Sequence, residues 1–246
     1  FFQIPMRPVP PDDEEYSVRK IRSKLKFSKE KIKIIKALEL LIIDEISMVR
    51  ADIIDFMDKV LRVYSGNMRE PFGGKQLLLV GDVFQLEPVV TADMRDVLRR
   101  FYPNSYFFSA FAFREFSLVP IELRKIYRQK DSNFISMLDR IRLGAATAND
   151  LAVLNARVNE RFDCDKTKMV MQLATRRDMV DAINEEQLNL LPAQEVIYEG
   201  YIKGEFPENS LPTLRELVLK TGAQVVFIKN DPEKRWVNGS VGKIYL

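Results

Sequence analysis

The stretch ELLIIDEISMV, residues 39–49, decides the fold, because an unbroken apolar run ends there in two adjacent carboxylates, Asp44 and Glu45. A second apolar run, QLLLV at residues 76–80, leads directly into GDVFQLEPV at residues 81–89. Strands that are apolar at every position, rather than at alternate positions, are typical of parallel sheets covered on both faces. The two runs therefore predict neighbouring parallel strands.

The segment between these strands, residues 50–64, predicts a helix. Its apolar residues recur with helical spacing, at positions 53, 54, 57, 60, 61 and 64. Parallel strands need a crossover connection, which is usually a helix. The first half of the chain is therefore predicted to be an α/β domain.

The remaining sequence predicts more elements of both kinds. Strands are expected at residues 106–109 and 117–123, around a short aromatic helix. From residue 131 onward, helices are expected at 132–143, 148–158 and 177–191, with strands at 168–175, 195–202, 223–229 and 241–246. Near residues 120–130 the sequence pattern changes from predicted strands to predicted helices. This change predicts two domains, 1–125 and 126–246.

Composition excludes several classes of protein. The 246 residues are 46% hydrophobic and 30% charged, as in folded domains, and the net charge of +3 is compatible with a polyanionic partner without requiring one. The chain has no histidine, which excludes imidazole catalysis and histidine-containing zinc sites within it. Its single cysteine, Cys164, cannot form an intrachain disulfide and fits a reducing, intracellular compartment. No apolar run approaches the ~20 residues of a membrane span.

A basic segment precedes the first strand. Residues 19–36 contain nine Lys or Arg and one Glu, interrupted by apolar residues. Two interpretations stay open: a surface that contacts phosphates, or a solvated helix face with a few apolar anchors.

The carboxyl ends of the two predicted strands carry the residues that could do chemistry: Asp44 and Glu45 on one, Gly81, Asp82 and Gln85 on the other. Ligands of open parallel sheets bind at these ends. One carboxylate can hold Mg²⁺ through its water shell, a second can orient the attacking water, and an amide can contact the γ-phosphate. An Asp-Glu pair alone is common in α/β proteins, but both segments in this order favour a nucleoside triphosphatase.

Two further features bear on that hypothesis. Arg128, in ELRKIYRQ, is either an arginine finger for the transferred phosphoryl group or a surface arginine near a strand end. No complete phosphate-binding loop, G-x-x-x-x-G-K-[ST], is present: Gly74-Lys75 has Arg69 in place of the first glycine, and Gly242-Lys243 has Val237 there.

Aromatic residues in predicted loops could stack on single-stranded bases, at roughly 1–3 kcal/mol per base. The candidates are Phe1, Phe2, Phe84, Tyr102 and Trp236.

Four segments together resemble the PIF-type DNA helicases, relatives of the RecD helicases in superfamily one. They are LLIIDEISMV, LLLVGDVFQLEPV, ELRKIYRQ and LKTGAQVVFIKND with WVNGSVGKI; in addition, MDKVLRV resembles a signature of that family, and FFQIP resembles the tail of its motif Ia. The resemblance covers nearly the whole chain.

This resemblance implies two RecA-like domains with mostly parallel sheets, both incomplete here. It implies a motor of DNA repair, recombination or telomere maintenance that acts as a monomer on single-stranded DNA and duplex junctions, moves from 5′ to 3′, and uses ATP and Mg²⁺. Asp44 would be the Mg²⁺-associated acid, Glu45 the water-activating acid, Gln85 the γ-phosphate sensor and Arg128 the finger. Gly81 and Asp82 would line the nucleotide site, and Phe1 and Phe2 would lie beside the DNA.

The sequence departs from the family pattern at its ends. It starts at Phe1 without methionine and lacks both the phosphate-binding loop and the downstream H-K-S-Q-G pattern, so we expect an excerpt that neither binds ATP tightly nor unwinds DNA by itself. Two alternatives stay open: a non-catalytic protein that binds single-stranded DNA or acts as a scaffold on a helicase-derived frame, and a motor of RecD type within a nuclease or conjugation system.

Overall fold

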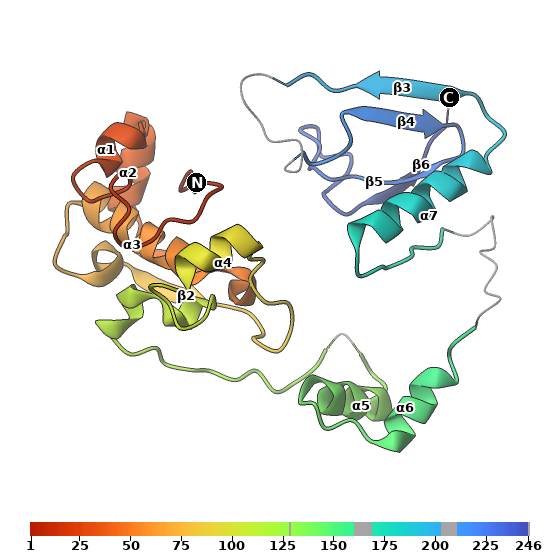
Figure 1. Ribbon diagram of the computed structural model, residues 1–246, viewed down its shortest axis with the longest axis horizontal. Coiled ribbons are helices and arrows are strands. Elements are labelled where there is room, and N and C mark those ends of the chain that lie inside the picture. The colour runs from red at the N-terminus through yellow and green to blue at the C-terminus, as the bar shows by residue number, and fades with distance from the viewer. Residues whose placement is uncertain (128, 160–168, 203–210, 246) are drawn as a thin grey trace. The chain divides into compact units, whose positions relative to one another are not determined.

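The structure is a computed structural model that describes residues 1–127, 129–159, 169–202 and 211–245. The chain divides into two compact units, Phe1–Val158 and Asn159–Leu246 (Figure 1). No helix among the described residues is both long enough and apolar enough to cross a membrane. Arg128 and Cys164 lie outside the described residues. The boundary between RecA-like domains that we expect at residue 125 stays a prediction.

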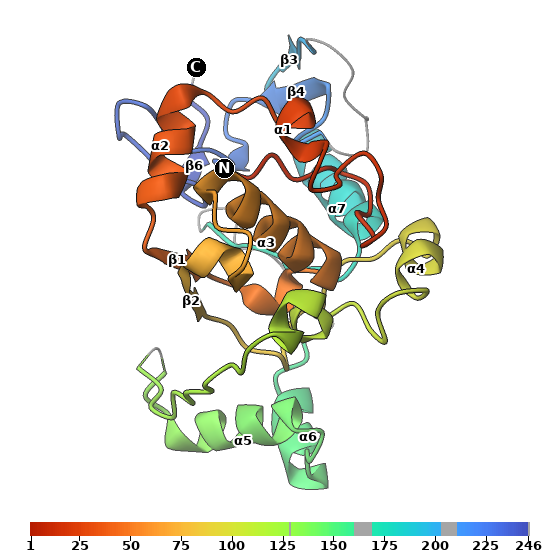
Figure 2. The same ribbon diagram turned by 90° about the vertical axis from the view of Figure 1, so that its left-hand side faces the viewer.

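A parallel strand pair forms the frame of the first unit. β1 (Leu40–Ile43) pairs with β2 (Gln76–Leu79) in parallel, with Ile43 opposite Leu79, as the sequence predicted. Figure 2 shows the two strands side by side, with α3 (Ala51–Ser65) in the connection between them. The α/β class and the parallel pairing are confirmed.

Only one face of this strand pair is packed. Leu41, Ile43, Leu77 and Leu79 lie against the hydrophobic core. On the opposite face, Ile42 is 57% exposed, and Leu40 and Leu78 are also exposed. The expectation that both faces are covered is therefore wrong for this chain, because no described element packs over the second face.

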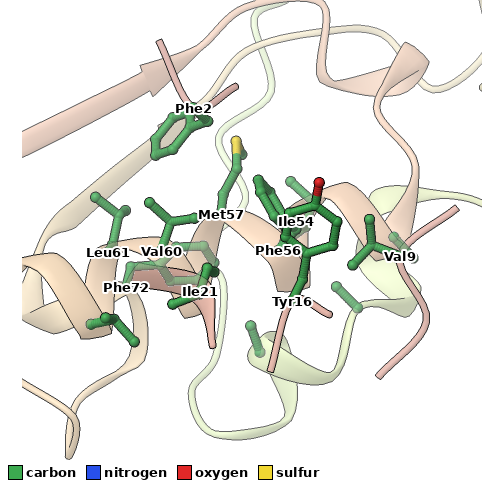
Figure 3. Packing of buried hydrophobic residues seen from close by; sticks show 14 of the residues in the cluster. Phe2, Val9, Tyr16, Ile21, Ile54, Phe56, Met57, Val60, Leu61 and Phe72 are labelled. Atoms are coloured by element: carbon green, nitrogen blue, oxygen red, sulfur yellow. The ribbon is translucent and has the colours of Figure 1, made fainter. Parts of the chain in front are cut away.

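Helix α3 carries the core of the first unit. Its buried face contains residues at the predicted helical spacing, including Ile54, Met57, Val60 and Leu61, and burial of each such side chain contributes about 1.5–3 kcal/mol. Two short helices pack against it, α1 (Ile21–Lys24) and α2 (Lys29–Ala37). Figure 3 shows Tyr16 beside Phe56, where the two rings meet edge to face at 5.5 Å.

Three acids on α3 tie distant loops to the helix. Asp52 accepts the Val9 N–H at 3.0 Å, and Asp58 accepts the Phe72 N–H. Asp55 accepts from the Tyr102 hydroxyl and from the N–H groups of Phe111 and Ala112, at 2.8–3.0 Å. These acids are spaced three residues apart, so each faces a different loop around one side of the helix.

The remaining regular elements of the first unit are helices and 3₁₀ turns. It contains the 3₁₀ turns η1 (Ile46–Met48), η2 (Pro71–Gly74), η3 (Phe107–Ser109) and η4 (Phe111–Arg114), and the α-helices α4 (Ala92–Leu98), α5 (Ser132–Arg142) and α6 (Ala148–Asn155). The helices expected after residue 131 are confirmed. The strands expected at 106–109 and 117–123 are absent: the first segment forms η3, and the second has no regular structure. In the first segment, the rings of Tyr106, Phe107 and Phe108 pack against one another, and only Tyr106 forms an isolated β-bridge, with Arg50. In the second, Val119, Ile121 and Leu123 are exposed.

The second unit contains α7 (Arg177–Asn189) and two antiparallel strand pairs. β3 (Glu195–Glu199) pairs with β4 (Glu216–Lys220), and β5 (Gln224–Val226) pairs with β6 (Val241–Lys243). The expectation of mostly parallel sheets does not hold here, because antiparallel strands can be joined by loops without a crossover helix. Residues 169–175, expected to be a strand, form none.

Candidate functional site

The carboxyl ends of β1 and β2 are held together by backbone hydrogen bonds. The Val80 N–H donates to the Ile43 carbonyl at 2.8 Å, and the Ile46 N–H donates to the Val80 carbonyl at 3.0 Å. The chain therefore leaves both strands at the same sheet edge, and Asp44 and Gly81 follow directly on each side.

Asp44 and Glu45 lie in a strained, exposed turn. Asp44 Oδ1 accepts the Glu45 N–H at 2.9 Å, and Glu45 has left-handed backbone angles, φ 51° and ψ 43°. That conformation costs a non-glycine residue about 1–2 kcal/mol. Burial of the next side chain, Ile46, helps to hold it. Strain of this kind is concentrated at functional sites, so the turn supports a functional role for the acids.

Gly81 allows the two segments to approach closely. A Cβ atom at this position would lie 2.9 Å from the Ile46 nitrogen and 3.3 Å from the Ser47 nitrogen. Any other residue would push apart the segments that follow the two strands. The glycine therefore brings the loop at residues 81–89 next to the acids.

Asp82 organises that loop. Its carboxylate accepts the Phe84 N–H at 3.0 Å and the Gln85 side-chain amide at 3.1 Å, and Arg142 of α5 lies 3.6 Å away. The Phe84 N–H, followed by Gln85 and Arg142, holds the pKa of Asp82 below its ordinary value. The Asp82 carboxylate therefore holds the side chain of Gln85 in the position that it has in this structure.

The predicted aromatic contacts differ in accessibility. Phe1 is 60% exposed, but Phe2 is 8% exposed and belongs to the core, so its ring does not fit a base-stacking role. Tyr102 is also buried, with its hydroxyl on Asp55. Phe84 is exposed, whereas the Trp236 ring stacks on Phe227 at 4.4 Å.

Ser47 is a candidate site residue that the sequence analysis missed. Its hydroxyl is buried and has no hydrogen-bond partner within the described residues. A small polar side chain two residues after Glu45 was the available signal, because a purely structural position in that apolar setting would favour alanine or valine.

Asp44 and Glu45 fit a metal ion that is bound jointly by protein and substrate better than a metal ion bound by protein side chains alone. Among the described residues, no group of three or more His, Cys, Asp or Glu side chains could hold a metal ion. Mg²⁺ in phosphate-binding sites keeps several waters and needs only one or two carboxylates in addition to the phosphates. Asp44 and Glu45, exposed at the strand end, provide that donor set.

Comparisons with known proteins identify the family of the chain. The chain is 34% identical over 209 residues to the ATP-dependent DNA helicase PIF1 of Xenopus laevis, covering 83% of this chain and 31% of that protein. The solved structure of Bacteroides Pif1 helicase in complex with ADP-AlF3 and ssDNA has a TM-score of 0.78 at 36% identity, over 98% of this chain and 54% of that one.

A second solved structure, described as two coordinating Pif1 helicases at forked dsDNA, has a TM-score of 0.80 at 36% identity and covers 100% of this chain and 55% of that one. The chain thus spans about a third of the curated relative's length (31%) and about half of each solved chain (54% and 55%). The sequence model of the PIF1-like helicase family matches residues 1–151. With that match over more than half of its residues, the chain belongs to the PIF1-like helicase family.

Proposed function

We propose that the whole protein is an ATP-dependent DNA helicase and that this chain supplies the acids and the phosphate sensor of its ATP site. The observation that supports this most is the shared sheet edge, where Asp44 and Glu45 follow β1 beside Gly81 and the Gln85 loop. The names of the relatives, ATP-dependent DNA helicases, point to the same activity.

Each residue has a proposed role in hydrolysis. Bound ATP with Mg²⁺ would supply the phosphoryl group and the positive charge that offsets its oxygens. Asp44 would accept hydrogen bonds from metal-bound water, and Glu45 would orient and deprotonate the attacking water. Gln85 would leave its bond to Asp82 and contact the terminal phosphate, while Arg128 would stabilise charge on the transferred group.

The nucleic-acid partners are proposed from the relatives. Solved structures of Pif1 helicases are described with ssDNA and at forked dsDNA. We propose the same partners here, with movement from 5′ to 3′, an intracellular location and a motor that works as a monomer. Because one neighbour is described as two coordinating helicases, sedimentation of the protein on forked DNA tests the number of copies directly.

The test is DNA-stimulated ATP hydrolysis by the full-length protein with Glu45→Gln. We expect turnover to fall by at least roughly 100-fold while nucleotide binding is retained, because the amide keeps the shape and loses the base. Glu39→Gln, an exposed glutamate just before β1, is the matched control and should keep normal turnover. Unchanged turnover in Glu45→Gln would remove that residue from its role.

The sequence contains no complete phosphate-binding loop, so we propose that the 246 residues alone do not hydrolyse ATP. The alternative function, a non-catalytic DNA-binding protein on the same frame, also predicts no hydrolysis by this chain. Measurable DNA-stimulated hydrolysis by the 246-residue chain would refute this part. Hydrolysis by the full-length protein would exclude the non-catalytic alternative.

A further inference from the structure

A basic pocket lies in the first unit between the α1–α2 segment and the end of α3. Its volume is about 230 Å³, and its walls contain three cations and two aromatic rings; it is lined by Arg22, Leu25, Lys26, Phe27, Ile32, Lys36 and Tyr64. No acidic side chain lines it. A pocket of this composition favours an anionic ligand.

Among the described residues, the cations that line the pocket lack the ion pairs that other cations of the same basic segment form. Lys20 and Lys24 lie within ion-pair distance of Glu14 and Glu15. By contrast, Arg22, Lys26 and Lys36 form no ion pair within the part of the chain that the structure describes. The acidic loop thus neutralises one part of the basic segment and leaves the pocket positively charged.

The pocket walls are fixed in place. Arg22 donates to the Val63 carbonyl at 2.6 Å, and the Tyr64 hydroxyl donates to the Leu25 carbonyl. The rings of Phe27 and Tyr64 pack at 4.6 Å. These contacts hold a cation and two rings in position before any ligand arrives, which reduces the entropy cost of binding.

The pocket lies at the opposite sheet edge from the acids. Lys36 precedes β1, and its carbonyl accepts from Lys75, which precedes β2, at 2.9 Å. Asp44 follows the other end of β1, a strand of four residues that spans about 13 Å. The pocket is therefore separate from the candidate ATP site.

Helix α2 extends the positive charge beyond the pocket. Lys29, Lys33 and Lys36 are exposed and recur at the spacing of one helix face. Over that span the helix rises about 10 Å. Successive phosphates of one DNA strand are about 3.4 Å apart along the duplex axis, so the three lysines span several phosphates. A strip of this length suits an extended polyanion better than a single small anion.

We propose that this pocket and the α2 strip bind the phosphate backbone of a nucleic acid, at a site remote from the ATP site. The inference rests on the proposed function as a DNA motor. Arg22, Lys26 and Lys36 contact phosphates, and Phe27 and Tyr64 form the apolar wall against which a sugar lies. An acidic peptide is the competing occupant, and the test below separates the two.

The test measures binding of fluorescein-labelled single-stranded and duplex DNA to the 246-residue chain by anisotropy, across a series of KCl concentrations. In the double variant Lys26→Gln/Lys36→Gln, we expect affinity near 0.1 M salt to fall by roughly fivefold to tenfold per cation and the salt slope to fall by about two. The matched control, Lys20→Gln/Lys24→Gln, removes the same charge from cations already paired with Glu14 and Glu15, and should change affinity by less than about twofold.

Equal losses in the two double variants would overturn the proposal, because they would indicate a general charge effect. Unchanged binding in Lys26→Gln/Lys36→Gln would also overturn it, and would leave the ATP site untouched. Polyglutamate that binds through the pocket while DNA binding is unaffected would assign the site to an acidic peptide instead. If the unaltered chain binds neither form of DNA, this proposal fails, whereas the DNA partner proposed for the whole protein fails only if DNA does not stimulate ATP hydrolysis by the full-length protein.

Discussion

The backbone N–H of Ile46 donates to the carbonyl of Val80 at 3.0 Å, and this bond joins the segment after one strand to the segment after the other. It continues the β1–β2 ladder past the last paired residues, so the turn with Asp44 and Glu45 cannot move independently of the Gly81 loop. The candidate ATP site is therefore part of the sheet frame.

Gly81→Ala should disturb this edge. The added methyl would lie 2.9 Å from the Ile46 nitrogen, and we expect a loss of about 1–3 kcal/mol in the free energy of unfolding together with loss of ATPase activity in the full-length protein. Urea denaturation and turnover measure the two effects. Gly144→Ala is the control: its methyl meets nothing within 4 Å and only its φ of +67° is unfavourable, so stability should fall modestly and turnover should persist.

Ser47→Ala should leave the stability of the chain unchanged or raise it by up to about 1 kcal/mol, because the buried hydroxyl has no partner in the described residues. Thermal unfolding of the 246-residue chain measures this. A loss above about 1 kcal/mol would show that the hydroxyl is already satisfied. Loss of turnover in the full-length protein with stability unchanged would instead show that the hydroxyl meets a partner at the ATP site.

Asp52→Ala should be strongly destabilising. Asp52 is fully buried, accepts the Val9 N–H, and forms a two-point ion pair with Arg50 at 2.9 Å. Removal of one partner of a buried pair costs about 3–5 kcal/mol. Asp12→Ala, at an exposed position, is the control and should stay within about 0.5 kcal/mol in the same denaturant titration.

Asp55→Asn tests the pH dependence of stability. Burial raises the pKa of Asp55 above its ordinary value, against the lowering effect of its three hydrogen-bond donors. The folded state then holds the proton more tightly than the unfolded state, so this group stabilises the fold at low pH and loses that contribution as pH rises from the ordinary pKa through the raised one.

The stability of the unaltered chain minus that of Asp55→Asn should therefore fall as the pH rises above the ordinary aspartate pKa of about 4. Denaturation at several pH values measures the difference, which cancels the contributions of groups that do not interact with Asp55. A difference that rises with pH would mean that the hydrogen bonds from Tyr102, Phe111 and Ala112 outweigh burial.

Ile42→Thr and Ile43→Thr test the register of the sheet. Ile43 packs on the core and Ile42 is 57% exposed, so we expect about 1–2 kcal/mol of destabilisation for Ile43→Thr and less than about 0.5 kcal/mol for Ile42→Thr. Chemical denaturation of the 246-residue chain compares them. The reverse order would contradict the strand pairing described here.

The sequence predicted the β1–α3–β2 frame because its features are local. Continuous apolar runs mark the two strands, and apolar spacing marks α3, with Gly66 ending that helix in a left-handed conformation. The adjacency of Asp44 and Gly81 then followed from the common direction of parallel strands.

The missed features depend on contacts between distant residues. Nothing in the sequence around Asp55 indicates that its partners lie at Tyr102 and Phe111, and nothing around Lys24 indicates that Glu15 pairs with it. Likewise, the antiparallel pairing in the second unit depends on which strands meet, and this is not encoded in the apolar pattern of either strand.

The most direct test of the proposed ATP site is the effect of Mg²⁺ on ATP affinity in the full-length protein with Asp44→Asn, measured by calorimetry with and without the metal. We expect Mg²⁺ to strengthen binding to the unaltered protein and to give little or no gain in Asp44→Asn, while affinity without metal stays the same and Asp82→Asn keeps the gain. An equal gain from Mg²⁺ in Asp44→Asn and in the unaltered protein would contradict the assignment of the β1 acids to a metal–nucleotide site.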